Sequence, residues 1–433
     1  MHHLVIHKLG PIDDCELTCS QFMTFTGFQA SGKSTIAKVI FYFRTVKDDI
    51  FSIAEEKALG TFPPDNNRSK AKLKKLLIDH LREKFLRVFG SSWGMDNDMY
   101  LKYYYTEQCY VQIKLKEETL YPTPNYIWID LSPALSTFLE KNDDIFSSNA
   151  LGIPELQKQK LQSDLRTFFD DPFDIVYIPA GRSMLTLLSQ QLSYIYTTMK
   201  DSQKRTIDYC TQDYIERILS LKTEFTNGLA GVMAYHGSKG GLPKSTLNLA
   251  LELIQKILRG NYSFSNGEER INFSDNRYVK INFASSGQQE SVWILNLLFY
   301  YLANNTPVMF IIEEPESHLF PESQKFITEL IALANNSKHS VVVTTHSPYV
   351  LGTLNNLLYA GQMPNNLQKQ ASGIISSNLW IKYDCFNAWF VKDGGIEECM
   401  DADIHLIQNE KIDKISKVIN KDFDSLFDLQ IDE

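Results

Sequence analysis

A glycine-rich octapeptide near the start of the chain restricts the possible folds more than any other feature. It matches the pattern G-x-x-x-x-G-K-[ST] and reads Gly27-Phe28-Gln29-Ala30-Ser31-Gly32-Lys33-Ser34. The apolar run Gln21 to Thr26 precedes it, and a helical pattern that begins at Thr35 follows it. A strand, a glycine loop and a helix in this order form a cradle for phosphate groups. A chance match in a glycine-containing turn is the alternative, and the flanking strand and helix argue against it.

The residues of this loop have distinct expected roles. Gly27 and Gly32 let the backbone turn so that successive N–H groups point inward at the phosphates. The helix N-terminus adds a partial positive charge. We expect residues 27–35 to bind a polyphosphate, with Lys33 at the β- and γ-phosphates and the Ser34 hydroxyl on Mg²⁺.

Two acidic residues follow the most apolar strand pattern in the chain. The run Val308 to Ile312 reads as a buried parallel strand, and Glu313 and Glu314 come directly after it. Adjacent carboxylates are costly to bury without a cation or a proton. We therefore expect Glu313 to hold Mg²⁺ together with Ser34, and Glu314 to orient or deprotonate an attacking water. A solvated acidic turn is the alternative.

A third strand pattern, Ser340 to Thr345, ends in His346. A lone histidine is usually structural, but ligands of α/β proteins bind at the carboxyl ends of the strands. The position therefore predicts that His346 forms a hydrogen bond with the γ-phosphate or with the attacking water.

A turn of small residues, Ser285-Ser286-Gly287-Gln288, precedes the apolar helix pattern from Ser291 to Ala303. Such a turn at a helix N-terminus leaves backbone N–H groups free to meet an anion. It also reads as a simple N-cap, in which Ser285 or Ser286 caps and Gln288 or Gln289 reciprocates. From these residues alone, the cap is the favoured interpretation.

Together and in this order, the four motifs resemble the ABC-type ATPase head of SMC and RecF proteins, and they are most similar to RecF-like and OLD-like bacterial ATPases. The matching residues are Lys33 and Ser34 for Walker A, Ser285 to Gln288 for the signature motif, Glu313 and Glu314 for Walker B and the catalytic glutamate, Ser317 to Leu319 for the D-loop, and His346 for the switch histidine. Two positions depart from the pattern, because many relatives have aspartate at 313 and transporters have glycine at 286.

The resemblance implies an α/β P-loop NTPase fold with a mixed β-sheet flanked by helices, and ATP and Mg²⁺ as cofactors. It also implies a homodimer or larger homo-oligomer in which ATP lies between two heads. One head then supplies the glycine loop, Glu313 and Glu314, and the other supplies Ser285, Ser286 and Gly287.

The resemblance covers both ends of the chain but not its middle. We assign the ATPase head to residues 1–45, 170–190 and 261–433, and an inserted, mostly helical lobe to residues 46–169 and 191–260. Within the head, residues 4–9 read as a strand, and residues 16–18 are expected to pair with the strand before the glycine loop. Arg182 follows the buried strand pattern Asp174 to Ile178, where its guanidinium could meet a phosphate, a partner's carboxylate or a structural ion-pair partner.

Composition limits the class of protein and of partner. The chain has 433 residues and a net charge of −9, which argues against a surface that binds nucleic acid everywhere. Its six cysteines contain no C-x-x-C pair, and no apolar run is long enough to cross a bilayer. We expect a soluble cytoplasmic protein with no membrane partner. The adjacent histidines His2 and His3 are expected to be solvated rather than bound to metal.

The part of the chain after His346 bears on whether the protein carries a nuclease domain of its own. Asp401-Ala402-Asp403 has the form of the acidic triplet that OLD-type relatives carry in a nuclease domain, but a solvated acidic helix N-terminus is the favoured interpretation. The chain then resembles the ATPase components of bacterial anti-phage systems of the PARIS, Septu and retron-associated types. This resemblance implies a sensor or scaffold that controls a separate effector protein, for example a nuclease. The alternative is a RecF-like DNA-maintenance ATPase that clamps DNA in an ATP-dependent way, which the acidic balance disfavours.

Overall fold

A six-stranded mixed sheet forms the centre of the computed structural model, which describes residues 2–59, 71–90, 95–115, 126–143, 153–187, 199, 207–237, 241–274, 277–408, 418 and 420–424. Five of its strands are parallel, and the edge strand β14 is antiparallel. In spatial order the strands are β14 (Gly395–Glu398), β13 (Phe386–Lys392), β3 (Phe22–Gly27), β12 (Ser340–Thr345), β11 (Val308–Glu313) and β7 (Asp174–Ile178). The expected α/β fold with a mixed sheet is confirmed.

A second, antiparallel sheet contains the N-terminus of the chain. Its order is β2 (Ile12–Thr18), β1 (His3–Leu9), β4 (Tyr100–Tyr104), β5 (Tyr110–Leu115) and β6 (Ile127–Leu131). The prediction that residues 16–18 pair with the strand before the glycine loop is wrong, because β2 forms a hairpin with β1 instead. Since β4 also pairs with β1, residues of the predicted insertion share this sheet with the N-terminal residues. The boundaries of the insertion stay a prediction, and the one at 190/191 lies outside the described residues.

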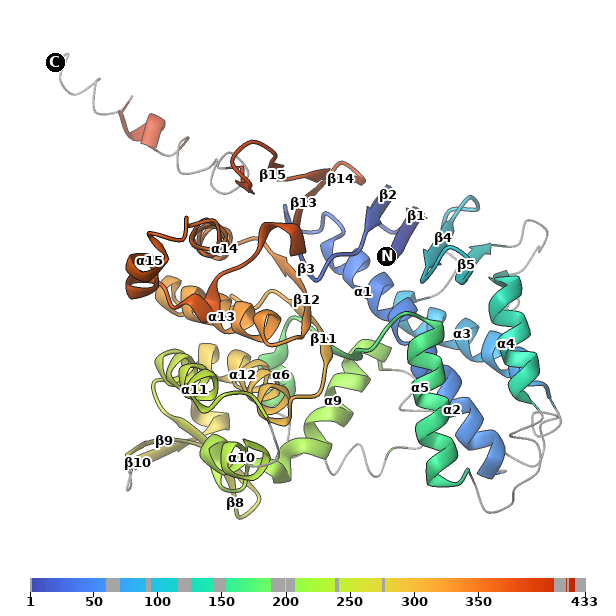
Figure 1. The fold of residues 1–433 in the computed structure, drawn as a ribbon, viewed down its shortest axis with the longest axis horizontal. Helices are drawn as coiled ribbons and strands as arrows, with labels where there is room; N and C mark the ends of the chain where they lie inside the picture. Colours follow the sequence, from blue (N-terminus) through green and yellow to red (C-terminus); the bar gives the residue numbers. More distant parts are fainter. Residues whose placement is uncertain are drawn as a thin grey trace.

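Helices cover both faces of the central sheet, and Figure 1 shows them as two groups on either side of its strands. The first group, on the side of the antiparallel sheet, is α1 (Lys33–Arg44), α2 (Val46–Leu59), α3 (Leu73–Phe89), α4 (Pro133–Asp143) and α5 (Glu155–Phe168). The second group is α6 (Arg182–Leu187), α10 (Gly228–His236), α11 (Lys244–Leu258), α12 (Ser286–Asn304), α13 (Pro321–Asn336) and α14 (Pro348–Gly361). The helix α9 (Tyr209–Leu221) lies beside the edge strand β7 and contributes to both cores, and α15 (Gln368–Ile374) has no buried residue.

The central sheet separates two apolar cores. Side chains alternate along each strand, so that Ile311 belongs to the core shared with α1, and its neighbours Phe310 and Ile312 belong to the core shared with α12 and α13. Strands buried on both faces in this way read as continuous apolar runs, which explains the composition of β11 and β12. No helix in the described part of the chain has the length and apolar character that crossing a bilayer requires.

The remaining strands form small sheets. A three-stranded antiparallel sheet precedes α12, and a two-stranded one follows β14. These strands are β8 (Asn261–Ser265), β9 (Glu268–Ser274), β10 (Arg277–Lys280), β15 (Met400–Asp401) and β16 (Leu406–Ile407). The predicted acidic helix at Asp401 is wrong: Asp401 ends β15, and its carboxylate accepts hydrogen bonds from the N–H groups of Asp403 and Ile404. A short Asp side chain favours such a turn over a helix because it satisfies the turn's own backbone donors.

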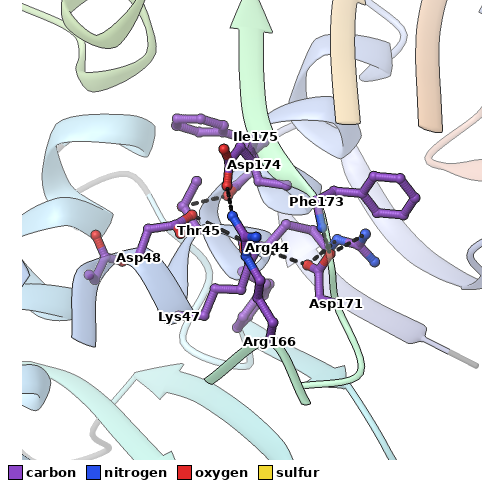
Figure 2. Close-up of polar contacts among 12 residues, drawn as sticks. Arg44, Thr45, Lys47, Asp48, Arg166, Asp171, Phe173, Asp174 and Ile175 are labelled. Atoms are coloured by element: carbon purple, nitrogen blue, oxygen red, sulfur yellow. Dashed lines mark hydrogen bonds and ion pairs between the residues drawn. The ribbon is translucent and has the colours of Figure 1, made fainter. Parts of the chain in front are cut away.

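A buried polar network ties the end of α1 to the segment that enters β7. Figure 2 shows Arg44 and Lys47 beside Asp171, and both contact its carboxylate at 3.0 Å. Although burial opposes it, these two cations hold the pKa of Asp171 below its usual range. Arg44 also donates to Nδ1 of His2 at 2.8 Å, and Nε2 of His2 lies 3.1 Å from the carbonyl oxygen of Asp170.

The prediction that His2 is solvated is therefore wrong. His2 is 6% exposed, and the Tyr103 hydroxyl also approaches its Nδ1 at 2.9 Å. These contacts assign the neutral tautomer, with the proton on Nε2. Burial and the charge of Arg44 lower the pKa of His2 to about 3.

We expect His2 to make the protein less stable in mild acid. A histidine whose pKa is lower in the folded state is protonated preferentially in the unfolded chain, so its contribution is complete above about pH 6.5 and is lost as the pH falls toward 3. Between pH 7.5 and 5.5 the loss is about 1.4 kcal/mol. Urea unfolding of the wild type and of His2→Gln at both pH values measures it, and the variant should lose less stability by this amount.

His3→Gln is the matched control, because His3 lies next to His2 but is only partly buried. Its stability should change with pH as that of the wild type does. An equal pH dependence in the wild type and in His2→Gln would contradict the buried neutral histidine.

Candidate functional site

The carboxyl ends of β3, β11 and β12 bring the predicted site residues to one edge of the central sheet. The parallel register pairs Glu313 with Thr344 and Thr345 with Thr26. Gly27, Glu314 and His346 therefore leave the sheet at the same edge, in agreement with the rule that ligands of open α/β sheets bind there.

The two glycines of the loop have conformations that other residues rarely adopt. Gly27 has φ 146°, and a Cβ atom there would lie 2.3 Å from the carbonyl oxygen of Val391 in β13. Gly32 has φ 107°, and a Cβ atom there would lie 2.4 Å from Ile12 of the β1–β2 hairpin. Neither position accepts a side chain, so the hairpin and β13 both restrict the path of the loop.

Lys33 lies at the first position of α1 and points back into the loop. Its ammonium donates hydrogen bonds to the carbonyl oxygens of Gly27 at 2.9 Å and of Phe28 at 2.6 Å. Burial lowers the pKa of Lys33, although Glu314 and Glu316 oppose the effect. Gly32, the residue before the helix, provides no side-chain cap, so the first N–H groups of α1 are left for a ligand.

Ser34 and Glu313 meet as the sequence predicts. The Ser34 hydroxyl donates to Oε2 of Glu313 at 3.2 Å, and the Tyr177 hydroxyl donates to Oε1 of the same carboxylate. Glu313 is buried, and in the part of the chain that the structure describes its carboxylate contacts two hydroxyls and forms no ion pair. A hydroxyl and a carboxylate oxygen side by side are hard oxygen ligands of the type that Mg²⁺ takes, together with phosphate and water oxygens. These residues therefore fit the expected metal.

Glu314 and His346 face one another beside this pair. Nδ1 of His346 lies 3.6 Å from Oε1 of Glu314, and the Ser317 hydroxyl donates to Oε2 of Glu314 at 3.2 Å. The contact between the two side chains lowers the pKa of Glu314 and raises that of His346. Glu314 has φ 43°, a left-handed conformation that turns it out of the strand, and its N–H donates to the carbonyl oxygen of Thr344.

Glu316 belongs to the same group, although no sequence pattern identified it. One oxygen of its buried carboxylate accepts hydrogen bonds from the Thr345 hydroxyl at 2.6 Å and from the His346 N–H at 2.9 Å. The same oxygen lies 3.8 Å from Nδ1 of His346. Glu316 thus fixes the backbone of His346 and adds to the negative charge around its ring.

The serine–glycine turn forms the helix cap that the residues themselves predict. Ser285 is the N-cap of α12, its hydroxyl accepts from the Gln288 N–H at 3.4 Å, and Oε1 of Gln288 accepts from the Ser285 N–H at 3.1 Å. Nε2 of Gln288 donates to the carbonyl oxygen of Leu258, so this side chain faces its own chain. Ser285 and Ser286 are exposed. Among the described residues, the hydrogen bonds of this turn stay near α12 and do not reach the glycine loop.

The sequence did not identify two residues of the site, and it left the partner of a third residue undecided. Tyr177 and Glu316 were not identified, because a tyrosine inside a strand and a third acid after a proline have no distinctive spacing. Arg182 was noticed at the end of β7, and the structure places it in an ion pair with Glu290, at 3.2 Å within the same chain. The position of Arg182 just after a buried strand was the sequence feature that pointed to it.

A family model described as an AAA ATPase domain matches residues 2–351. No curated protein matches the sequence.

Among solved structures, an SMC head domain from Thermotoga maritima is 12% identical with a TM-score of 0.36, over 92% of this chain and 97% of that one. An Smc head bound to the C-winged helix domain of ScpA is 11% identical with a TM-score of 0.38, over 92% and 96% of the two chains. An Smc head with an extended coiled coil, bound to the C-terminal domain of ScpA from Pyrococcus furiosus, is 10% identical with a TM-score of 0.37, over the same shares.

Proposed function

This chain belongs to the AAA ATPase domain family, and from that premise we propose that it binds ATP with Mg²⁺ and hydrolyses it at a site shared by two copies. The observation that carries the proposal is the group of polar side chains at one sheet edge, where Ser34 contacts Glu313 and Glu314 contacts His346. Lys33 and the N–H groups at the start of α1 are placed to bind the β- and γ-phosphates.

The chemistry follows from the charges of these groups. Glu314 is kept ionised by His346, which suits a carboxylate that accepts a proton from an attacking water. His346, with its raised pKa, is placed to donate to an oxygen that gains negative charge. Mg²⁺ bound by Ser34 and Glu313 would neutralise charge on the phosphate oxygens.

The surface around the site supports association with a second copy. Large apolar side chains are exposed on the loops that follow β3 and β11, at the start of α14, and beside the serine–glycine turn. They are Phe28 (71% exposed), Phe283 (78%), Phe320 (75%) and Tyr349 (53%). Exposed apolar groups that collect around polar ones are typical of an interaction surface. In such a dimer, the exposed Ser286 of one copy meets the nucleotide in the glycine loop of the other.

Mixing two inactive variants tests the shared site. Lys33→Ala damages the glycine loop. Ser286→Arg places a bulky side chain at the exposed start of α12, the surface that is proposed to meet the partner's nucleotide. Each variant alone should be inactive in phosphate release. An equal mixture should recover activity above that of either variant and below about one quarter of the wild-type activity, because half of the dimers are mixed and each contains one intact site.

A mixture that stays as inactive as its components would contradict the shared site. Phosphate release by Ser286→Arg alone at the wild-type rate would contradict it as well. The mass of each variant and of the mixture in solution, measured with and without ATP, shows whether the dimers have formed.

We further propose that the nucleotide state controls a separate effector protein in anti-phage defence. The order of the motifs along the chain and their amino-acid sequences support this role. Phage challenge of cells that carry the chain with its neighbouring genes tests it, and Lys33→Ala should abolish protection. Tight binding of duplex DNA that depends on both ATP and salt would instead support a DNA clamp.

A further inference from the structure

Arg182 occupies an unusual place beside the proposed catalytic residues. It is the first residue of α6, just beyond β7, and its side chain is completely buried. The guanidinium donates to the carbonyl oxygens of Glu313 at 2.6 Å, Glu314 at 3.0 Å and Pro179 at 2.5 Å. One cation therefore fixes both peptide groups that carry the two glutamates.

Glu290 joins the same cation to α12. It lies just over one turn into this helix, and its carboxylate accepts from the backbone N–H groups of Arg182 at 2.9 Å and Ser183 at 2.6 Å. The two side chains form an ion pair at 3.2 Å, with 0% and 1% exposure, and Nε of Arg182 also donates to the carbonyl oxygen of Glu290.

A second close approach lies within the serine–glycine turn itself. A Cβ atom at Gly287 would be 2.7 Å from the carbonyl oxygen of His318, in the loop that follows Glu314. The start of α12 thus approaches the segment that follows β11 directly at Gly287, and Glu290 connects it to Glu313 and Glu314 only through Arg182. A shift of α12 has to move this segment or break a buried ion pair.

A buried ion pair is a poor means of stabilising a fold, because desolvation offsets much of its attraction. It does specify position, and a planar guanidinium with five donors can hold several acceptors at once. We propose that Arg182 and Glu290 are positioning residues that couple the start of α12 to the peptide groups of Glu313 and Glu314. Contact of the serine–glycine turn with the nucleotide of a partner copy then sets the position of the catalytic glutamate in the same chain as the turn.

This inference rests on the proposed shared ATP site, and its test separates the two. The double variant Arg182→Met/Glu290→Gln removes both charges, so neither is left buried alone, and the amide oxygen can still accept from one of the two N–H groups. Its ATP dissociation constant should stay within about twofold of wild type, because the variant leaves the glycine loop untouched. The rate of phosphate release per bound ATP should fall by at least about tenfold, the effect of lost positioning.

The dependence of the rate on ATP concentration is the second readout. Two coupled sites give a Hill coefficient above 1, and the double variant should bring it to about 1. The matched control is Lys222→Met/Glu269→Gln, which removes another buried ion pair, at 2.7 Å, whose carboxylate contacts Trp293 of α12. The control should lose stability but keep the wild-type rate per bound ATP and the wild-type Hill coefficient.

Each outcome decides between the possibilities. A double variant with the wild-type rate per bound ATP overturns the inference, and so does an equal fall in the control. A wild-type protein that neither binds nor hydrolyses ATP overturns the proposed function instead. If Arg182→Met/Glu290→Gln does not fold, Arg182→Lys is used: it keeps the charge but replaces the planar guanidinium and its five donors with one ammonium nitrogen, and it should show the same change in rate with unchanged ATP binding.

Discussion

Replacing Lys33 with alanine is expected to lower the rate of ATP hydrolysis by a factor of about 10²–10³ or more, the usual effect of removing one preorganised donor from a charged transition state. Among the described residues, the buried ammonium of the wild type donates its hydrogen bonds to the carbonyl oxygens of Gly27 and Phe28. Because burial lowers its pKa, a polyanion is a much better partner than these neutral groups. A phosphate-release assay measures the fall in rate, and calorimetric titration with ATP measures the accompanying loss of ATP binding.

The control for Lys33→Ala is Lys256→Ala. Lys256 is an exposed lysine on α11 that pairs with Glu252, and such a surface pair contributes little to stability. This control should bind and hydrolyse ATP as the wild type does. An unchanged rate in a folded Lys33→Ala protein would contradict the phosphate-binding loop.

Glu314→Gln is expected to bind ATP but to hydrolyse it about 10²–10⁴ times more slowly, the usual contribution of a general base. The amide has the shape of the carboxylate but cannot accept the proton of an attacking water. Because the nucleotide is retained, the joined dimer should accumulate, with a mass about twice the 49.7 kDa of one chain. Light scattering with and without ATP measures the mass, and phosphate release measures the rate.

Glu322→Gln is the matched exchange for this experiment. Glu322 lies at the exposed start of α13 and pairs with Arg259 at the surface. This variant should turn over ATP normally and should not accumulate the dimer. If Glu314→Gln remained a monomer with normal turnover, neither the catalytic role of Glu314 nor the retention of the dimer would hold.

The sequence predicts most of the proposed nucleotide-binding edge, because the relevant information is local. A buried strand, a glycine loop and a helix follow one another within residues 22–44, and Glu313, Glu314 and His346 follow strands in the same way. Parallel strands then bring their carboxyl ends together, so the contact between Ser34 and Glu313 could be expected from two separate motifs.

The contacts that the sequence did not predict join residues far apart in the chain. His2 is buried because β1 pairs with β4, which places Tyr103 against it, and no periodicity near residue 2 encodes that partner. The partner of Arg182 lies 108 residues away in α12. The predicted pairing of residues 16–18 was wrong because the sequence shows the alternation of β2 but does not specify which neighbouring strand completes its hydrogen bonds.

The close approach of Gly287 to His318 affects how variants of the serine–glycine turn are interpreted. Even a methyl group at position 287 would displace the loop after Glu314 in the same molecule. An inactive Gly287→Ala protein would therefore report damage to its own catalytic loop, whatever the partner copy contributes. Ser286, which is exposed at the first position of α12, is the residue through which that contribution can be measured separately.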